Sequence, residues 1–252
     1  IRQIFPDDRG PNDDDAAPQN KSGLHLDIHS YGRLILWPYG HKTGNSPNNE
    51  GFVNLGNKLA WFNNYTPQQS IGLYATDGTS DNVSYGELGV AALTFELGRS
   101  FFQDCASYES TIKPDNLAAL TYAAKVSAAP YQLPIGPDIS LILVNQSLKE
   151  TTVTAGTPID LEVSAAVDQT LLTGNDNVVG QIEYAIDLPF GHEDTVAISL
   201  EQSIVVDSNG NATASAQIDT SAMTLGQHIL YVQAKNTDGQ AGVSQAVFIN
   251  IA

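Results

Sequence analysis

Hydrophobic and polar positions follow two different patterns along the chain, and the change lies near residue 131. Before it, residues 23–29 alternate and residues 34–37 and 90–97 are apolar runs, all of which predict strands. Residues 49–63 and 115–127 carry apolar side chains at three- and four-residue steps, which predicts helices. In the second helix, the inward positions are expected to be Leu117, Leu120, Ala124 and Val126. Strands that alternate with helices indicate an α/β layered structure.

After a proline-containing linker expected at 132–138, the pattern has a period of two residues. Short alternating runs predict a β-sandwich over 139–252. The eight expected strands are 139–144, 158–167, 180–188, 195–200, 203–207, 211–219, 228–235 and 243–251. The last two runs and their NTDGQAG turn resemble the closing hairpin of the immunoglobulin-like modules attached to many secreted bacterial enzymes. We therefore expect an immunoglobulin-like accessory domain over 139–252.

Charge excludes one class of partner. The 252-residue chain has a formal net charge of −17, and its second part is the more acidic, with 2 basic and 14 acidic residues from position 138 onward. Such a surface repels phosphate backbones, so nucleic acid is not an expected partner. No apolar run approaches the roughly 18 residues of a membrane span, so we expect no transmembrane segment.

The first residues suggest that the sequence begins inside a fold. Ile1, Ile4 and Phe5 read as the last turn of an amphipathic helix that Pro6 ends. No basic-then-apolar signal region is found there. We expect the chain to be a fragment of a longer protein.

Two strands contain polar residues that need an explanation. In DIHSYGRLILWPYG, His29 lies on one face of the alternating strand with His25 and Asp27. A single strand histidine is more often a hydrogen-bonded core residue than a metal ligand, and both interpretations stay open. In LTFELG, Glu96 lies between apolar neighbours. A carboxylate there costs several kcal/mol unless it is paired, metal-bound or partly solvated, so a functional role is a second possibility.

Three segments taken together resemble one family. DIHSYGRLILWPYG, LYATDGTSDNVSYGELG and TFELG, in this order and spacing, resemble the C-terminal half of the catalytic domain of zinc carboxypeptidases of the carboxypeptidase A/B/T type. The resemblance extends over residues 1–131 and implies part of an α/β domain with a mixed sheet and helices. It also implies a secreted or periplasmic bacterial metallopeptidase that uses zinc. Its substrates would be peptides or proteins with a free C-terminus, cut at the last peptide bond.

The resemblance assigns roles to single residues. His29 matches the third protein ligand of zinc, and Glu96 matches the general base and acid. Ser30 and Tyr31 match the pair that lines the substrate cleft. Tyr74 matches the mobile tyrosine that covers the bound peptide terminus, although an exposed loop aromatic is the alternative.

Asp81 falls at the base of the pocket for the C-terminal side chain. A carboxylate there would favour a terminal Lys or Arg. Alternatively, Asp81 shapes a loop with Ser80 and Asn82, which is a common use of aspartate.

Other candidates have weaker support. His25 is about 13 Å from His29 along a strand, so both cannot bind one metal, and His25 is expected to be an outer partner or solvated. Residues 13–15 are three aspartates that could bind calcium, but a solvated loop is the preferred interpretation. His192 and His228 lie in the expected sandwich and indicate no catalytic role.

The sequence departs from the family in one respect. The H-x-x-E element that supplies the other two zinc ligands does not occur in this chain, and the substrate-binding arginine elements are missing as well. We therefore expect this chain alone to bind zinc weakly and to be inactive. Two further hypotheses remain: a cell-wall peptide amidase of the same fold, and a non-catalytic pseudo-enzyme or adhesion module.

Overall fold

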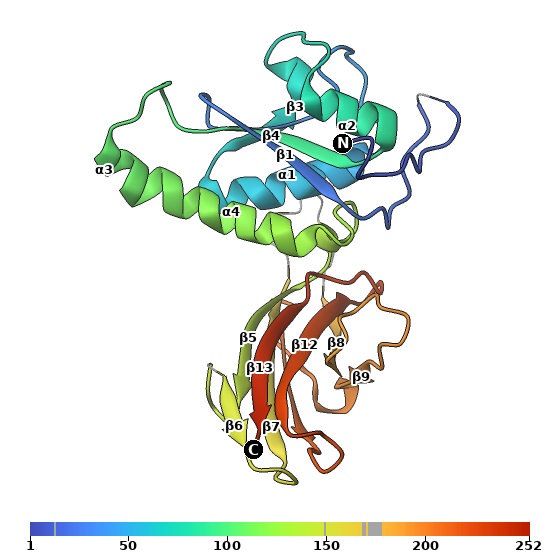
Figure 1. Cartoon of the computed structure of the whole chain (residues 1–252), viewed down its shortest axis with the longest axis vertical. Coiled ribbons are helices and arrows are strands. Elements are labelled where there is room, and N and C mark those ends of the chain that lie inside the picture. Colours follow the sequence, from blue (N-terminus) through green and yellow to red (C-terminus); the bar gives the residue numbers. More distant parts are fainter. Residues whose placement is uncertain (13, 149, 168–169, 171–177) are drawn as a thin grey trace. The chain divides into compact units, whose positions relative to one another are not determined.

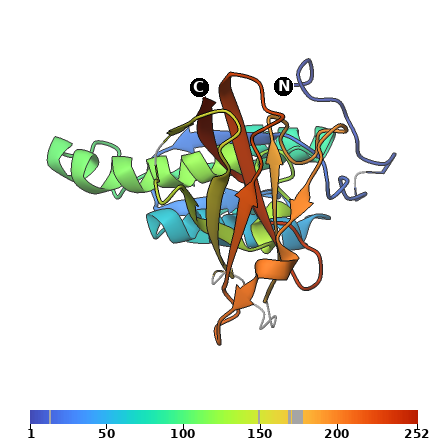
Figure 2. The same ribbon diagram turned by 90° about the horizontal axis from the view of Figure 1, so that it is seen from below.

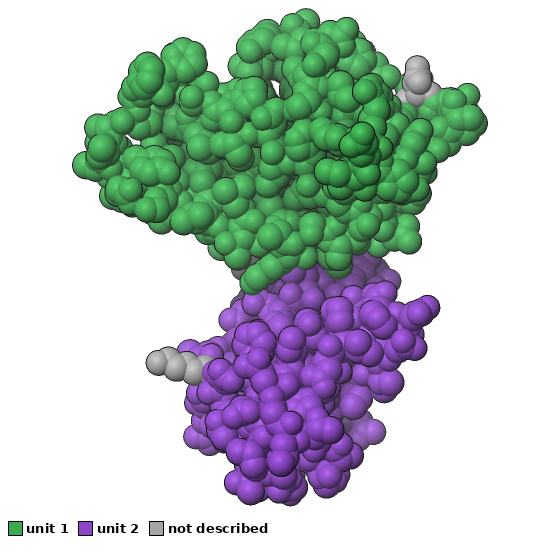
Figure 3. Space-filling model, viewed as in Figure 1, with its two compact units in different colours: residues 1–134, 170–172 green, residues 135–169, 173–252 purple. Residues whose placement is uncertain are grey.

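The computed structural model describes residues 1–12, 14–148, 150–167, 170 and 178–252. The chain divides into two compact units, one of which is largely Ile1–Pro134, while the other contains most of Ile135–Ala252 (Figure 3). Each unit is described by itself. Within the described part of the chain, no helix combines the length and the apolar character that crossing a bilayer requires.

The first unit is built on a four-stranded mixed sheet. Its strands have the spatial order β1 (Leu24–His29), β4 (Ala91–Glu96), β2 (Leu34–Trp37) and β3 (Thr66–Gln69). β1 runs parallel to β4 and β2 parallel to β3, while β2 and β4 are antiparallel. The carboxyl ends of β1 and β4 therefore meet at one edge of the sheet.

Helices cover both faces of this sheet (Figure 1). α1 (Asn49–Asn63) and α4 (Lys113–Val126) pack together on one face, and α2 (Ser80–Leu88) packs against β1 and β4. The remaining helical segments of this unit are short: Ser70–Gly72, α3 (Cys105–Ser107), a π-helical turn Tyr108–Ile112 and Leu133–Ile135 at its boundary.

The helix expected at 49–63 is confirmed, and the apolar positions that predicted it are buried in the core of the first unit. Phe52, Leu55 and Leu59 are fully buried. Gly56 lies between them on the same helix, and a Cβ at this position would crowd the Trp37 ring of β2. The helix stops at Asn64, which adopts the left-handed conformation common at helix ends.

The second expected helix is present, but its buried face was assigned only partly correctly: Val126 is buried as expected and Leu120 is half-buried. α4 buries Ala119, Ala123 and Val126, whereas Leu117 and Ala124 are exposed. Leu117 is 53% exposed. Asn116 takes the place expected for Leu117, which rotates the buried stripe by one residue, about 100° around the helix. The apolar character of Leu117 misled the assignment.

Two local interpretations also differ from the structure. The alternative in which Asp81 shapes a loop with Ser80 and Asn82 is wrong, because these residues begin α2, whose Ser, Asp, Asn and Gly content gives a weak helical signal. Residues 1–5 form a turn, with the amides of Ile4 and Phe5 bonded to the Ile1 carbonyl, and not a regular helix. Ile4 is 74% exposed, while Phe5 is half-buried with its ring close to Gly23.

The second unit consists of two sheets (Figures 1 and 2). One sheet has the order β10-β11-β7-β5 and the other β6-β13-β12-β8-β9. The strands are β5 (Asp138–Val144), β6 (Thr151–Val153), β7 (Ile159–Ala166), β8 (Val179–Ile186), β9 (Ile198–Ser199), β10 (Val205–Val206), β11 (Ala212–Ile218), β12 (Gly226–Asn236) and β13 (Gln245–Ile251), with a 3-10 turn at Glu201–Ser203.

Both sheets contribute to one apolar core. Ile142 and Leu161 from one sheet and Ile182, Leu230 and Ile249 from the other belong to a single buried cluster. Every expected run contains a strand, and β6 is an additional strand of three residues, too short to show a period. The expectation of a mixed α/β part followed by a β-sheet part is therefore confirmed at this level.

Candidate active site

The parallel pairing of β1 with β4 brings the two unusual polar residues together. His29 is the register partner of Glu96, and each ends its strand. The Nδ1 atom of His29 lies 3.9 Å from Oε1 of Glu96. These two side chains therefore converge at neighbouring strand ends, as the joint roles implied by the resemblance require.

A cavity of about 120 Å³ lies beside this pair. Besides His29 and Glu96, its wall includes Asp27 of β1, Tyr74 and Asp81. Asp81 is 3% exposed and accepts a 3.4 Å hydrogen bond from the Ser70 hydroxyl. Tyr74 is 63% exposed at the rim. Asp27 and Glu96, which are 69 positions apart in the sequence, thus share one hollow.

Ser30 and Tyr31 do not line this cavity. Both are exposed, and the Tyr31 ring meets Phe101 edge-to-face with a centroid separation of 4.8 Å. The structure therefore does not bring this pair into the hollow shared by His29, Glu96 and the other expected residues.

Asp27 joins the histidine to α2. Its Oδ1 atom lies 3.1 Å from Nε2 of His29, and its Oδ2 atom accepts a hydrogen bond from the Ser80 hydroxyl. The Ser80 hydrogen bond is the main cause of the lowered pKa of Asp27. Asp27 is therefore held as a carboxylate that fixes the orientation of the imidazole. Sequence reasoning missed this role, although the alternation had placed both residues on one face.

His25 lies one step further back on the same face. Its Nδ1 atom is 2.8 Å from the Ser84 hydroxyl of α2, and its role as an outer partner of a metal site stays a prediction. Of the three aspartates at 13–15, residue 13 lies outside the described residues. Asp14 pairs with Lys42 at 2.8 Å, and Asp15 accepts hydrogen bonds from Asn12.

Glu96 carries a perturbed carboxyl group. Burial raises its pKa, and the neighbouring His29 partly opposes this shift. The Glu96 side chain is 14% exposed and lines the cavity. A carboxylate with a raised pKa at such a place can accept and return a proton.

The segment that contains this site is similar to known proteins of one family. Residues 14–120 match the sequence profile of the family described as "Zinc carboxypeptidase". A curated "Zinc carboxypeptidase" from Saccharothrix mutabilis subsp. capreolus is 37% identical over 79 residues. Residues 14–120 belong to the zinc carboxypeptidase family. The aligned part covers 29% of this chain and 18% of that relative, so the chain spans a small share of its length.

Solved structures add no argument about the fold. The chain is similar to dimeric latent PorU from Porphyromonas gingivalis at 14% identity and a TM-score of 0.34, over 66% of this chain and 12% of that one. It is also similar to fibronectin(III)-like modules of Clostridium thermocellum CbhA at 12% identity and a TM-score of 0.30, over 46% of this chain and 47% of the other.

The zinc carboxypeptidase family is zinc-dependent, so the donor set of the cavity decides what this chain can hold. A protein zinc site takes three or four ligands from histidine, cysteine or carboxylate. Over the described ranges, no group of three or more such side chains is placed to hold a metal ion. One nitrogen of His29 faces Asp27 and the other faces Glu96. The described residues of this cavity alone do not fit a zinc ion.

Proposed function

We propose that this chain is part of a zinc metallocarboxypeptidase, which hydrolyses the C-terminal peptide bond of peptides or proteins. The observation that carries the proposal is the pairing of His29 with Glu96 at two parallel strand ends, inside the segment that matches the family. An imidazole and a proton-accepting carboxylate at one cavity are the two groups that this chemistry needs from these strands.

In this proposal His29 is a ligand of the family's zinc ion, oriented by Asp27. Glu96 takes a proton from the attacking water and returns it to the leaving amine. The position of Asp27 supports the first role, because a carboxylate on the far nitrogen fixes the tautomer and the ring plane of a ligating histidine. The contact of a largely buried Glu96 with the cavity supports the second role.

The remaining residues would bind the substrate. Tyr74 at the rim would close over the peptide terminus, and Ser30 and Tyr31 would line the outer cleft. Asp81 would lie at the base of the pocket for the C-terminal side chain, where its buried carboxylate favours Lys or Arg. Ser80, Asp81 and Asn82 form the first turn of α2, so in place of the loop considered from the sequence, the competing role of Asp81 is a carboxylate that stabilises the helix N-terminus.

We further propose a domain organisation for the chain. Residues 1–131 belong to the catalytic domain, 132–138 are a linker, and 139–252 are an immunoglobulin-like accessory domain of a secreted or periplasmic bacterial enzyme. The two-sheet architecture with a common core supports the accessory assignment. Because a single imidazole does not hold zinc well against water, this chain by itself should bind zinc weakly and hydrolyse no peptide.

The test compares this chain with the intact natural protein. We expect the intact protein to release the last residue from a blocked peptide ending in Phe or Lys, and the ratio of these two rates reports the role of Asp81. His29→Ala should abolish zinc-dependent turnover and lower zinc content, and Glu96→Gln should abolish turnover while zinc is retained. Leu117→Ala, an exposed change on α4, is the matched control and should leave turnover unchanged.

Three results would contradict the proposal. Rapid hydrolysis by the 252-residue chain alone would refute the assignment of His29 as its single zinc ligand. Cleavage restricted to γ-linked cell-wall peptides would favour the amidase hypothesis. Absence of any turnover by the intact zinc-loaded protein would favour a non-catalytic module.

A further inference from the structure

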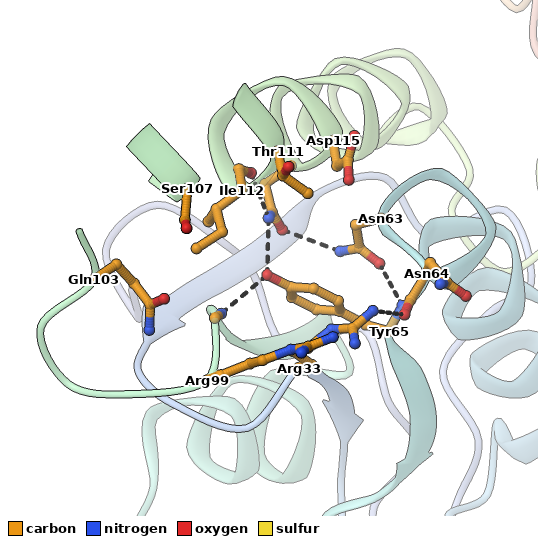
Figure 4. Close-up of a pocket in the computed structure, with 12 residues that line it drawn as sticks. Arg33, Asn63, Asn64, Tyr65, Arg99, Gln103, Ser107, Thr111, Ile112 and Asp115 are labelled. Carbon is orange, nitrogen blue, oxygen red and sulfur yellow. Dashed lines mark hydrogen bonds between the residues drawn. The ribbon is translucent and has the colours of Figure 1, made fainter. Parts of the chain in front are cut away.

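A second cavity in the first unit has an unusual set of hydrogen-bond donors (Figure 4). We call it the arginine cavity and define it by Arg33, Tyr65, Arg99, Asp115 and Asn116, which are among its lining residues. Its volume is about 340 Å³, within the usual range of small-molecule sites. It shares no lining residue with the cavity of His29 and Glu96.

Two of the four arginines of the chain line this cavity, and neither forms an ion pair among the described residues. By contrast, Arg2 pairs with Glu87 at 2.6 Å. Arg33 donates one hydrogen bond, to the Asn64 carbonyl at 2.8 Å, and its guanidinium carbon lies 5.7 Å from the centre of the Tyr65 ring. In a chain with a net charge of −17, carboxylate partners are abundant, yet these two guanidinium groups have none within the described structure.

The Tyr65 hydroxyl adds a third donor. Its oxygen accepts hydrogen bonds from the Gly98 amide and from Nδ2 of Asn116, both at 3.0 Å. The orientation of Asn116 is fixed, because Nδ2 also donates to the Ile112 carbonyl at 2.7 Å and Oδ1 accepts from Asn63 at 3.0 Å. Both partners of the Tyr65 oxygen are therefore donors, and its own hydrogen remains to be donated.

Among the described residues, no acceptor bonds the hydrogen of this hydroxyl, which lies in a nearly buried setting. Tyr65 is only 9% exposed, and Figure 4 shows its hydroxyl at the centre of the lining residues, with Asp115 on the helix away from the two arginines. The Tyr65 oxygen already accepts two hydrogen bonds, so what it can still offer a ligand in the cavity is its own hydrogen as a donor. The guanidinium groups of Arg33 and Arg99 and the hydroxyl of Tyr65 are all donors, which favours an anion with several oxygen atoms as the ligand.

We propose that the arginine cavity binds a small ligand through an oxyanion, either a carboxylate or a phosphate group, held by Arg33, Arg99 and the Tyr65 hydroxyl. Guanidinium groups present paired N–H donors that match the two oxygens of such a group. Asp115 in the same cavity opposes the accumulation of negative charge, so a singly charged group is favoured over a doubly charged one. This inference does not depend on the proposed peptidase activity.

Binding of acetate and of inorganic phosphate to the 252-residue chain tests the proposal, by NMR titration at constant ionic strength with chloride as the balancing anion. We expect saturable binding of one anion per chain, with the largest shift changes at the Gly98 amide and the Tyr65 ring. The acetate and phosphate arms decide which oxyanion is bound. Arg99→Gln should weaken binding by about tenfold or more.

Arg2→Gln is the matched control, since it removes an exposed arginine outside the cavity and should leave the affinity unchanged. Arg99 is exposed, so its substitution should leave the fold intact even if Arg33→Gln does not. The proposal is overturned if neither anion binds saturably, or if Arg99→Gln and Arg2→Gln weaken binding equally. It is also overturned if the shift changes fall on the cavity of His29.

Discussion

The side chain of His228 should stabilise the second unit in acid and lose this effect in alkali. His228 is 8% exposed, and both ring nitrogens face acceptors: Oδ2 of Asp187 at 2.7 Å and the Thr224 carbonyl at 2.8 Å. Two acceptors require two ring N–H groups, so the fold selects the imidazolium. Accordingly, the hydrogen bond to Thr224, followed by that to Asp187, raises the pKa of His228.

The size of the effect follows from the two contacts. A hydrogen bond that involves a charged group contributes a net of about 1.5–3 kcal/mol. The Asp187 side chain is 50% exposed, which screens its share. We therefore expect the pair of contacts to contribute about 1–2 kcal/mol, allowing for the cost of desolvating the ring.

The direction with pH follows from the raised pKa. Because the folded state binds the proton more tightly, the contribution is complete below the unfolded histidine pKa of about 6.5. It is lost as the pH rises through the higher folded pKa. His228→Gln should therefore lower the free energy of unfolding of the second unit at pH values below this range, and by a smaller amount well above it.

Urea unfolding followed by NMR intensities of β8 and β12 amides measures this unit separately from the first. His192→Gln is the control, because His192 lies in the same unit with its side chain 44% exposed and should change stability by less than about 0.5 kcal/mol. A His228 ring that titrates below about 6.5, or a loss that grows with pH, would refute the reasoning.

Two further predictions concern packing. Leu59→Ala should destabilise the first unit by about 2–5 kcal/mol, because the Leu59 side chain is fully buried, whereas Leu117→Ala, exposed on α4, should cost less than about 0.5 kcal/mol. Urea unfolding followed by the fluorescence of Trp37 and Trp61 compares the two variants. Equal losses of stability would contradict the assigned core. Gly242→Ala should destabilise the second unit by about 1–3 kcal/mol, because the added Cβ would overlap the Pro137 carbonyl oxygen and force a backbone shift. Gly44→Ala is its control, because the added methyl group would meet open space, and thermal unfolding followed by circular dichroism measures both variants. If Gly242→Ala left stability unchanged, the backbone segments at Gly242 and Pro137 could separate without cost, and the prediction would be wrong.

The sequence by itself determined the elements whose signals are local. Period-two alternation marked β1 and the strands of the second unit other than β6, and three- and four-residue spacing marked α1. The motifs around His29 and Glu96 pointed to a family that the comparison of residues 14–120 supports. A rotation of one residue around α4 escaped detection, because polar Asn116 is buried by its hydrogen bonds while apolar Leu117 is left outside.

Only the tertiary structure decided which distant side chains meet. The parallel register sets His29 beside Glu96, 67 positions away, and α2 brings Ser80 to Asp27. The arginine cavity likewise depends on the approach of Tyr65 to Asn116. Strand pairing and helix packing determine such contacts. The sequence does not show them, because the periodicity of apolar residues indicates which face of an element is buried but not which other element covers that face.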